Sequence, residues 1–345
     1  MSMDLPSANR QLAAGEHLSR EQMQDVMSLI MHGEATPAQI GAFLIALTIK
    51  GETVEEIVGA ANIMRQLAAR VETRSQHVAD TVGTGGDGAK LFNVSTASAL
   101  VASAAGVTMA KHGNRAATGN SGAADVLEAA GVNIGISPEQ VGQCIDQCGI
   151  GFMFAPTHHA ATRHAIGPRR EIGVRSIFNL LGPLTNPAGA QFQLVGVFSQ
   201  HWLKPLAEVF AELGSVHTVV VCSDDGLDEI SIAGRTLAAE LKNGTVSEFE
   251  IHPQDYGIQP TALDSIVVES AEQSLDMIQQ TLSGGKGPAY DMVALNAGAT
   301  LYAADKSESL ADGVTLAREI LDSGQGLAKL KQLAEFTSSL PDAKA

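Results

Sequence analysis

A glycine cluster followed by polar residues is the first part of the sequence that could do chemistry. Gly83-Thr84-Gly85-Gly86-Asp87-Gly88 comes directly after the short apolar run Val78 to Val82. Glycines let a backbone approach a ligand closely, and amides and hydroxyls at a helix start donate to phosphate oxygens. Asn93, Ser95 and Thr96 stand at the start of the next helical pattern. The segment therefore predicts a phosphate-binding loop.

The stretch that follows the cluster contains no acidic residue. No Asp or Glu occurs from Gly88 through Ala124, where about four would be expected by chance, and the same stretch holds Lys90, Lys111 and Arg115. The missing carboxylates remove repulsion that would oppose a polyanion. The cluster also satisfies the dinucleotide fingerprint, but that fold needs an acid about twenty residues later for the ribose. Glycines that only close tight turns would not explain the missing acids, so a phosphate-rich pocket is favoured.

A second polar segment, Lys111-His112-Gly113-Asn114-Arg115, follows the predicted strand Val107 to Ala110. We expect it to be a loop at the carboxyl edge of the sheet, where open α/β folds bind ligands. His112 could carry a proton, or it could only hydrogen-bond to the backbone. The pattern alone assigns it no catalytic role.

Carboxylates follow another predicted strand, Val216 to Cys222. The segment Asp224-Asp225-Gly226-Leu227-Asp228-Glu229 should lie at the same edge of the sheet. Magnesium prefers one or two carboxylates together with substrate oxygens and water, and a pyrophosphate needs such neutralisation to bind and to leave. Taken alone, the segment could equally be an acidic surface turn that caps the next element.

Arginines cluster between the segment Ala155-Pro156-Thr157-His158-His159 and the run from Phe178 to Pro187. One of them could clamp a substrate carboxylate through a bidentate guanidinium fork, although most such arginines pair only with surface acids. The cluster consists of Arg163, Arg169, Arg170 and Arg175. His158, His159 and His164 lack a carboxylate at zinc-site spacing, so no zinc site is expected.

The elements that must hold these motifs predict an α/β fold. Apolar residues recur at helical spacing from Ser19 to about Leu67, with Thr36-Pro37 and Thr53 as helix starts, and strands and helices alternate after His77. We expect a small all-helical N-terminal domain plus a larger α/β domain with a central, mostly parallel sheet covered by helices. Further expected strands are Phe152 to Ala155 and Leu194 to Phe198. Expected helices are Asn93 to Ala105, Gly122 to Ala130, Pro138 to Gln147, Leu203 to Leu213, Ala271 to Leu282, Asp291 to Ala304 and Ser307 to Asp322.

The composition excludes several classes of protein. A formal charge of -16, from 38 acids against 22 bases, disfavours binding to nucleic acid or to an anionic membrane. Three cysteines cannot form a disulfide framework, and Cys144 and Cys148, one helical turn apart, are expected to be buried and reduced. The start of the sequence, Met1 to Gly15, has no basic region followed by an apolar stretch, and the apolar runs are broken before membrane-spanning length, so we expect no signal peptide and no membrane span. We expect a soluble, cytoplasmic protein with small-molecule substrates.

Taken in order along the chain, the motifs closely resemble those of the anthranilate phosphoribosyltransferase family, which belongs to the nucleoside phosphorylase-like class of phosphoribosyltransferases. The match runs from the helical start to beyond Glu229 and is specific because several independent motifs keep the family order and spacing. The motifs are Gly83-Thr84-Gly85-Gly86-Asp87, Asn93-Val94-Ser95-Thr96, Lys111-His112-Gly113-Asn114-Arg115, Ser121-Gly122, Asp125-Val126-Leu127-Glu128, Arg169, the Asn179 to Pro187 turn and Asp228-Glu229.

The resemblance implies an activity and an architecture. The family transfers the phosphoribosyl group of phosphoribosyl pyrophosphate (PRPP) to the amino group of anthranilate. The products are N-(5-phosphoribosyl)anthranilate and pyrophosphate, and this is the second step of tryptophan biosynthesis from chorismate. The implied domains are a small helical one, residues 1–76 completed by a segment near 165–188, and an α/β one, residues 77–345, that binds PRPP at the carboxyl edge of its sheet. The resemblance also implies a homodimer formed through the helical domain.

The resemblance further implies site residues and the cofactor Mg²⁺. PRPP is expected to contact Gly83, Gly86, Asp87, Leu91, Asn93, Val94, Ser95, Thr96, Lys111, His112, Gly113, Asn114, Arg115, Ala116, Ala117, Thr118, Gly119 and Ala123. Anthranilate is expected to contact Gly83, Asn114, Ala155, Pro156, His159, Arg169, Arg175 and Gly182. Magnesium is expected on Ser95, Asp228 and Glu229. Two positions depart from the family pattern, because Leu91 replaces a common Thr and Ala123 replaces the second Ser of Ser-Gly-Ser.

Two other functions compete with this interpretation. A pyrimidine nucleoside phosphorylase has a related fold and a glycine-rich anion pocket, but the acidic pair and the extended Gly83 to Thr96 motif argue against it. A catalytically silent relative that binds nucleic acid or a regulatory nucleotide is disfavoured by the net charge and by the full set of catalytic-type residues.

Overall fold

Seven strands form one sheet in the computed structural model of the chain, which describes residues 2–86, 88–116 and 121–341. Their order is β3-β2-β1-β4-β5-β6-β7. The strands are β1 (Val78–Gly83), β2 (Thr108–Gly113), β3 (Ile150–Phe154), β4 (Phe192–Gly196), β5 (His217–Ser223), β6 (Thr236–Lys242) and β7 (Thr245–Ile251). β1 to β5 run parallel, whereas β6 and β7 are antiparallel additions at one edge. The expected mostly parallel sheet is confirmed, and the β6–β7 hairpin is an element that the sequence pattern did not reveal.

Capping residues determine where the N-terminal helices begin. α2 (Arg20–Met31), α3 (Pro37–Lys50) and α4 (Val54–Leu67) each follow a Ser or Thr that accepts a backbone N–H three residues on, while a Gln or Glu at that position bonds back to the cap. α1 (Leu5–Ala13), which the expected helical region did not include, follows the cap Asp4. The small helical region is therefore present, with one helix more than expected.

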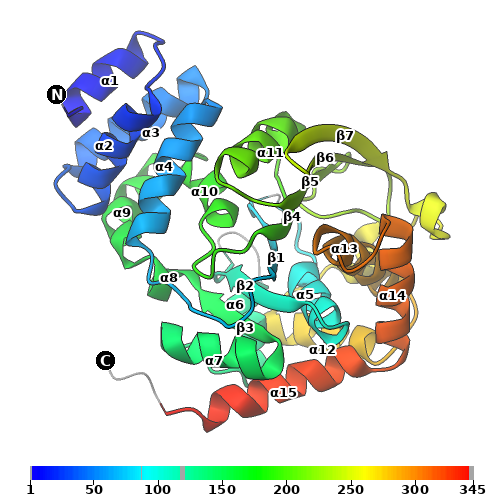
Figure 1. Cartoon of the computed structure of the whole chain (residues 1–345). Coiled ribbons are helices and arrows are strands. Elements are labelled where there is room, and N and C mark those ends of the chain that lie inside the picture. Colours follow the sequence, from blue (N-terminus) through cyan, green and yellow to red (C-terminus); the bar gives the residue numbers. More distant parts are fainter. Residues whose placement is uncertain (1, 87, 117–120, 342–345) are drawn as a thin grey trace.

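Helices cover both faces of the sheet (Figure 1). α11 (Leu203–Glu212) packs on β5 and β6, and α5 (Val94–Ala104) and α13 (Pro288–Ala303) pack on the opposite face. The other helices are α6 (Ala123–Ala129), α7 (Pro138–Cys148), α8 (Ala155–His158), α9 (Arg163–Ile172), α10 (Phe178–Leu184), α12 (Ala271–Leu282), α14 (Leu310–Asp322) and α15 (Gln325–Ser339). Across the described ranges, none of the helices combines the length and the apolar character needed to cross a membrane.

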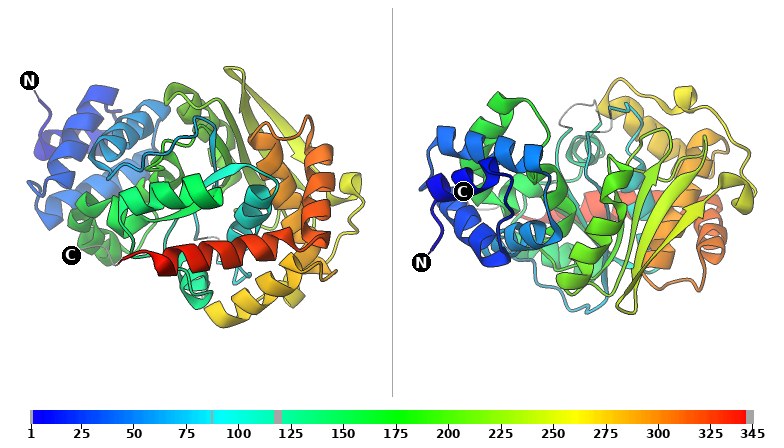
Figure 2. Two further views of the ribbon diagram at one scale, coloured as in Figure 1. Left: turned by 60° about the horizontal axis from the view of Figure 1, so that its bottom comes forward. Right: turned by 90° about the horizontal axis from the view of Figure 1, so that it is seen from above.

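Two hydrophobic clusters form the core, one on each face of the sheet. Successive strand residues alternate between them: Leu194 and Val219 belong to the cluster with α5 and α13, and Val195 and Val220 belong to the cluster with the N-terminal helices. The N-terminal helices stand beside the sheet at one end of the molecule (Figure 2). α9 contacts α2 and α3, and α10 contacts α4, so the segment near 165–188 lies against the helical region.

The end of β2 corrects one expectation. β2 continues to Gly113, so Lys111 and His112 are strand residues, and the predicted loop begins only at Asn114. Lys111 pairs with Phe152 and His112 with the next residue of β3. The prediction was wrong because two polar side chains signalled a loop, whereas both are buried within the sheet.

A buried carboxylate holds the N-terminal helices together. Glu56, the second acidic residue of α4, is fully buried. Its Oε1 accepts the Leu18 backbone N–H at 2.9 Å, and its Oε2 accepts the Lys50 Nζ at 2.7 Å and the Thr53 backbone N–H at 2.8 Å. The Lys50 side chain is itself buried. Glu56 therefore joins the start of α4 to the end of α3 and to the segment before α2.

Replacing Glu56 by Gln should lower the free energy of unfolding by about 3 kcal/mol, because the amide cannot repeat these contacts and leaves the buried Lys50 ammonium without the Glu56 carboxylate. Urea denaturation measures the change. The matched control is Glu55→Gln, which breaks an exposed ion pair with Arg20 and should cost less than about 1 kcal/mol. Equal losses in the two variants would contradict a special role for Glu56.

Candidate active site

A pocket of about 640 Å³ opens at the carboxyl ends of the parallel strands. β1 lies in the middle of the sheet with β2 on one side and β4 on the other, so the order of strands reverses beside it. Open α/β sheets bind ligands at such a reversal, because the connections on its two sides diverge there. Residues from β1, β2, α5, α9 and α10 line the pocket, and Met64 of α4 joins them from the helical region.

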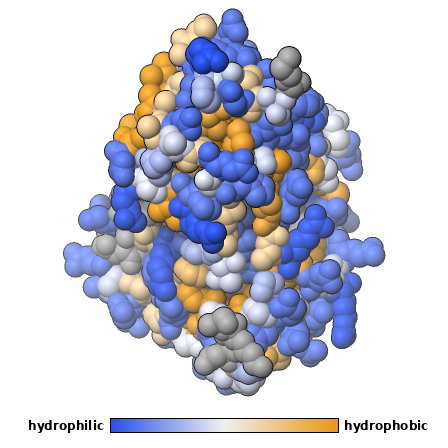
Figure 3. Space-filling view, turned by 90° about the vertical axis from the view of Figure 1, so that its left-hand side faces the viewer, coloured by the Kyte–Doolittle hydropathy of each residue, from blue (hydrophilic) through white to orange (hydrophobic). Residues whose placement is uncertain are grey.

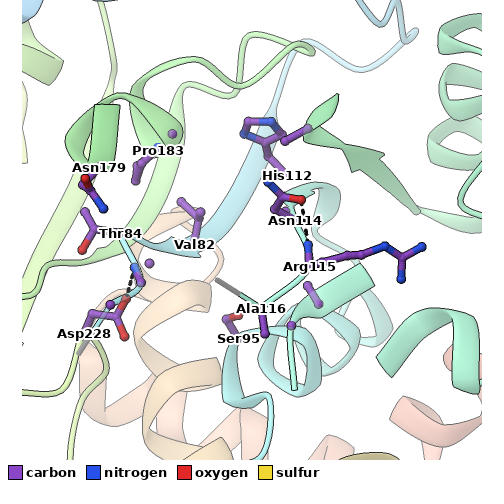
Figure 4. A pocket seen from close by; sticks show the side chains of 18 of the residues that line it. Val82, Thr84, Ser95, His112, Asn114, Arg115, Ala116, Asn179, Pro183 and Asp228 are labelled. Atoms are coloured by element: carbon purple, nitrogen blue, oxygen red, sulfur yellow. Dashed lines mark hydrogen bonds between the residues drawn. The ribbon is translucent and has the colours of Figure 1, made fainter. Parts of the chain in front are cut away.

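Two neighbouring glycines let an acidic segment cross the strand ends. Gly83 of β1 and Gly196 of β4 face each other in the parallel ladder. A Cβ on Gly83 would lie 2.2 Å from Asp228 Oδ2, and one on Gly196 would lie 1.5 Å from the Asp228 carbonyl oxygen. The Gly85 backbone N–H donates to Asp228 Oδ2 at 2.6 Å (Figure 4). No larger residue could occupy either strand end without displacing Asp228.

Asp228 and Glu229 both line the pocket, and Ser95 lines it from the start of α5. Hard oxygen ligands of this kind suit Mg²⁺, which takes one or two carboxylates and completes its shell with substrate oxygens and water. Within the described part of the chain, no group of three or more His, Cys, Asp or Glu could hold a metal by itself. The donor set therefore fits an ion that shares its shell with a phosphate-bearing substrate.

The side chains of the preceding acids, Asp224 and Asp225, form hydrogen bonds within the turn and do not reach the pocket. Asp224 Oδ2 accepts the Arg235 Nε at 3.0 Å, and Asp225 Oδ2 accepts the Ser231 hydroxyl at 2.6 Å. Neither lines the pocket. The alternative interpretation as a surface turn therefore holds for the first half of the acidic segment.

The start of α5 forms one wall of the pocket. Asn93 caps the helix: its Oδ1 accepts the Thr96 backbone N–H at 2.9 Å and the Ser95 hydroxyl at 3.3 Å, and its amide donates to the Ser121 carbonyl. Ser95 therefore faces the pocket (Figure 4). Thr96 is buried in the helix and does not line the pocket, so the structure does not bring it to the site.

A buried polar group lies where β1 and β2 separate. Asp80 of β1 accepts the His112 backbone N–H at 3.2 Å and the Asn186 side-chain amide at 2.8 Å. Lys111 donates from Nζ to the Thr81 carbonyl at 2.8 Å. Burial raises the pKa of Asp80 to about 6 in spite of the neighbouring Lys111. Burial lowers the pKa of Lys111, and Asp80, Glu229 and Asp228 oppose this shift.

Two buried histidines form another wall of the pocket. The rings of His112 and His159 lie 5.2 Å apart, and the Nε2 atom of each is enclosed by protein. The backbone of Gly182 lies beside the His112 ring and that of Thr185 beside the His159 ring. Burial and the nearby His159 hold the pKa of His112 well below its usual value, and burial together with the adjacent His158 lowers the pKa of His159 to about 4. Both rings are therefore neutral near pH 7, so this wall of the pocket is polar but carries no charge.

Two of the four clustered arginines reach the pocket. The Arg169 guanidinium lies 4.8 Å from the centre of the Phe178 ring, and burial lowers its pKa. Arg175 lies 4.5 Å from the centre of the Phe198 ring and donates to the Gly86 carbonyl. Arg163 and Arg170, which share α9 with Arg169, do not line the pocket. The ring stacked against Arg169 leaves its guanidinium edge available to a planar carboxylate.

Nearly all predicted site residues that the structure describes meet in this one pocket. The described members of the PRPP set except Thr96, the whole anthranilate set and the three metal positions line it. Leu91, one of the two departures from the family pattern, bridges to Val267 beside the pocket, and Ala123, the other, begins α6. Four predicted residues, Asp87, Ala117, Thr118 and Gly119, lie outside the described residues.

Sequence reasoning missed several residues of the site. Met64, Thr84, Ile166, Asn179 and Thr185 line the pocket and were not predicted as contacts. Asn179 and Thr185 belong to a turn that was recognised as a motif without a role. Asp80 was counted as part of an apolar run, although a lone acid inside a buried strand just before a glycine loop was a usable signal.

Comparison with known proteins places the chain in a family. The model of the glycosyl transferase family helical bundle domain matches residues 6–68, and that of the glycosyl transferase family a/b domain matches residues 75–327. Anthranilate phosphoribosyltransferase from Thioalkalivibrio sulfidiphilus is 56% identical over 337 residues, covering 98% of this chain and 100% of that protein.

Solved structures agree. The crystal structure of anthranilate phosphoribosyltransferase from Thermus thermophilus superposes with a TM-score of 0.92 at 42% identity, over 96% of this chain and 99% of that one. The Saccharomyces cerevisiae enzyme in complex with PRPP and Mg superposes with a TM-score of 0.89 at 27% identity, over 97% and 98%. The chain belongs to the anthranilate phosphoribosyltransferase family.

Proposed function

We propose that the chain transfers the phosphoribosyl group of PRPP to the amino group of anthranilate. The observation that carries the proposal is one pocket with three kinds of wall: a glycine turn beside Lys111, the carboxylate pair Asp228 and Glu229, and the guanidinium of Arg169. A pyrophosphate needs the first two, and the carboxylate of an aromatic acid needs the third. The products are N-(5-phosphoribosyl)anthranilate and pyrophosphate, in the second step of tryptophan biosynthesis.

PRPP lies between the glycine turn and the start of α5. The glycine turn from Gly83 to Gly86 lets the phosphates approach the backbone closely, the side chains of Asn93 and Ser95 donate to the phosphate oxygens, and the ammonium of Lys111 adds a positive charge. Asp228 and Glu229, with Ser95, would hold Mg²⁺. When bound, the ion neutralises charge on the pyrophosphate and so makes it a better leaving group.

Anthranilate lies on the side of the pocket that faces the helical region. Arg169 pairs with its carboxylate, Asn114 orients the ring substituents, and Ala155, Pro156 and Gly182 leave room for a flat ring. Figure 4 shows Asn114 on the same side of the pocket as His112, across from Asp228. The two substrates therefore bind with the amine directed towards the ribose.

The chemical step exchanges one bond for another at the anomeric carbon. The amine nitrogen forms a bond to this carbon, the bond to pyrophosphate breaks, and its electron pair leaves on the pyrophosphate oxygen. The nitrogen then loses one proton, which passes to the departing pyrophosphate or to water. An aromatic amine is neutral near pH 7, so alignment contributes more than a strong base.

We further propose a division of the chain into two domains, an oligomeric state and a cellular compartment. The smaller domain comprises residues 1–76 with the segment near 165–188, and the larger domain comprises residues 77–345. Limited proteolysis near residue 77 would test this boundary.

The chain forms a homodimer through the helical domain. Ile49 of α3 is 82% exposed, and apolar patches lie on this side of the molecule (Figure 3). Sedimentation at the mass of one chain would contradict the dimer.

The protein acts in the cytoplasm. Its three free, buried cysteines suit this reducing compartment, and cell fractionation would test the location.

The direct test follows the loss of anthranilate fluorescence with purified protein. Turnover should require PRPP and Mg²⁺, and omitting either should abolish it. Turnover of a pyrimidine nucleoside with inorganic phosphate instead would identify a phosphorylase. Binding of nucleic acid without any PRPP-dependent loss of anthranilate would identify a silent relative.

Replacing Arg169 by Ala should raise KM for anthranilate by about 100-fold and change KM for PRPP little, because only anthranilate loses a bidentate charged partner. Steady-state kinetics with each substrate varied in turn measure the split. Arg170→Ala is the matched control, since Arg170 is an exposed arginine of the same helix that does not line the pocket. Equal rises in both Michaelis constants would remove Arg169 from this role.

The double substitution Asp228→Asn with Glu229→Gln should abolish the response to Mg²⁺ and reduce kcat by more than about 100-fold, because the pocket loses its hard anionic oxygens. Activity titrated with MgCl₂ measures the effect. Asp224→Asn, in the same segment but paired with Arg235, should keep the wild-type response. Magnesium-dependent turnover in the double variant would place the ion elsewhere.

A further inference from the structure

The ladder between β1 and β2 stops before the strands end. Its last pair is Ala79 with Met109, although β1 runs on to Gly83 and β2 to Gly113. β2 remains paired with β3 as far as Gly113, and β1 with β4 as far as Gly83. A split therefore opens inside the sheet at its carboxyl edge, where the pocket begins.

Three side chains bond the backbone groups that the split leaves without a ladder partner. Asp80 accepts from the His112 N–H, Asn186 donates to the Ala110 carbonyl at 2.9 Å, and Lys111 donates to the Thr81 carbonyl at 2.8 Å and the His112 carbonyl at 3.3 Å. Buried backbone groups are costly when unpaired, so these contacts are what allow the strands to separate. Side-chain hydrogen bonds therefore stabilise the separated ends of β1 and β2.

Asp80 is the centre of this arrangement. It is fully buried and does not line the pocket. One oxygen holds the backbone of His112, and the other holds Asn186, which in turn holds β2 at Ala110. Its negative charge is also the largest of the interactions that keep Lys111 charged against the effect of burial. Lys111, unlike Asp80, lines the pocket.

We propose that Asp80 is a positioning residue for PRPP, which acts by fixing Lys111 and the end of β2 at the split between β1 and β2. The inference rests on the proposed function, in which Lys111 meets the pyrophosphate. Repulsion between Asp80 and the polyanion works in the opposite direction. It is the weaker effect, because Lys111 lines the pocket whereas Asp80 stands behind the pocket wall.

Asp80→Asn is the first test. The amide can still accept the His112 N–H, but it presents a second donor to Asn186 and removes the charge beside Lys111. We expect KM for PRPP to rise at least about tenfold, with KM for anthranilate and kcat changed much less. Calorimetry of PRPP titrated into the Mg²⁺-loaded protein should show the same loss. The control is Thr218→Val in β5, an isosteric change of a fully buried hydroxyl without a partner in the described chain.

A double-mutant cycle with Lys111→Met distinguishes positioning from general stability. If Asp80 acts through Lys111, Asp80→Asn should add no further loss of PRPP affinity to the Lys111→Met variant. Additive losses, or an unchanged or lower KM for PRPP in Asp80→Asn, would overturn the inference. Should Asp80→Asn not fold, Asn186→Ala enters the same cycle, since it removes the donor that fixes Asp80. A wild-type protein without PRPP-dependent turnover would reject the proposed function itself, whereas an active wild type with an additive cycle would reject only the role of Asp80.

Discussion

The crossing of Asp228 over the ends of β1 and β4 is the constraint on which the rest of the site depends. Only glycine at positions 83 and 196 leaves room for it, and the Gly85 N–H then anchors its carboxylate. The acidic segment is thereby brought against the glycine turn, so that carboxylates and amide donors face each other across a narrow space. Anionic groups and phosphate oxygens would repel each other there without a divalent ion between them. The backbone geometry thus explains why this pocket suits a metal-bound polyanion better than a bare one.

The same region contains buried polar side chains that are unusual inside a parallel sheet. The split between β1 and β2 buries a carboxylate, an ammonium and an amide together, and each satisfies the others or the backbone. Replacing such a set by apolar residues often costs little stability. Its presence beside the pocket is therefore better explained by the need to keep a charged lysine at a fixed place. The chain carries a net charge of -16, so its attraction for an anionic substrate has to be local.

The sequence predicted the parts of the fold that repeat a simple period or cap. The Thr36 and Thr53 capping boxes, the five parallel strands and the helices between them follow from such patterns. β6 and β7 were missed because Thr236 to Ile251 mixes charged and apolar residues on a half-exposed edge, where alternation is weak. At the site, the glycine cluster and the acidic pair could be recognised in the sequence. The packing of Asp228 against Gly196 could not, because contacts between strand ends that are distant in the sequence leave no local pattern. The extension of β2 through Lys111 and His112 was missed for a related reason, because buried polar residues resemble loop residues until their partners are known. Asp80, by contrast, was overlooked inside an apolar run.

The β6–β7 hairpin has a consequence for how the protein behaves at high concentration. β7 forms one border of the sheet, and its free backbone groups could template a strand from another molecule. Its outward residues include Glu248 and Glu250, both exposed, and Arg235 and His252 reach Glu250 from neighbouring positions. Like charges would meet if two such borders came together in register. The outermost strand is therefore protected against self-association by its own carboxylates, and the parallel strands that shape the catalytic cleft are kept away from any solvent-facing margin on that side.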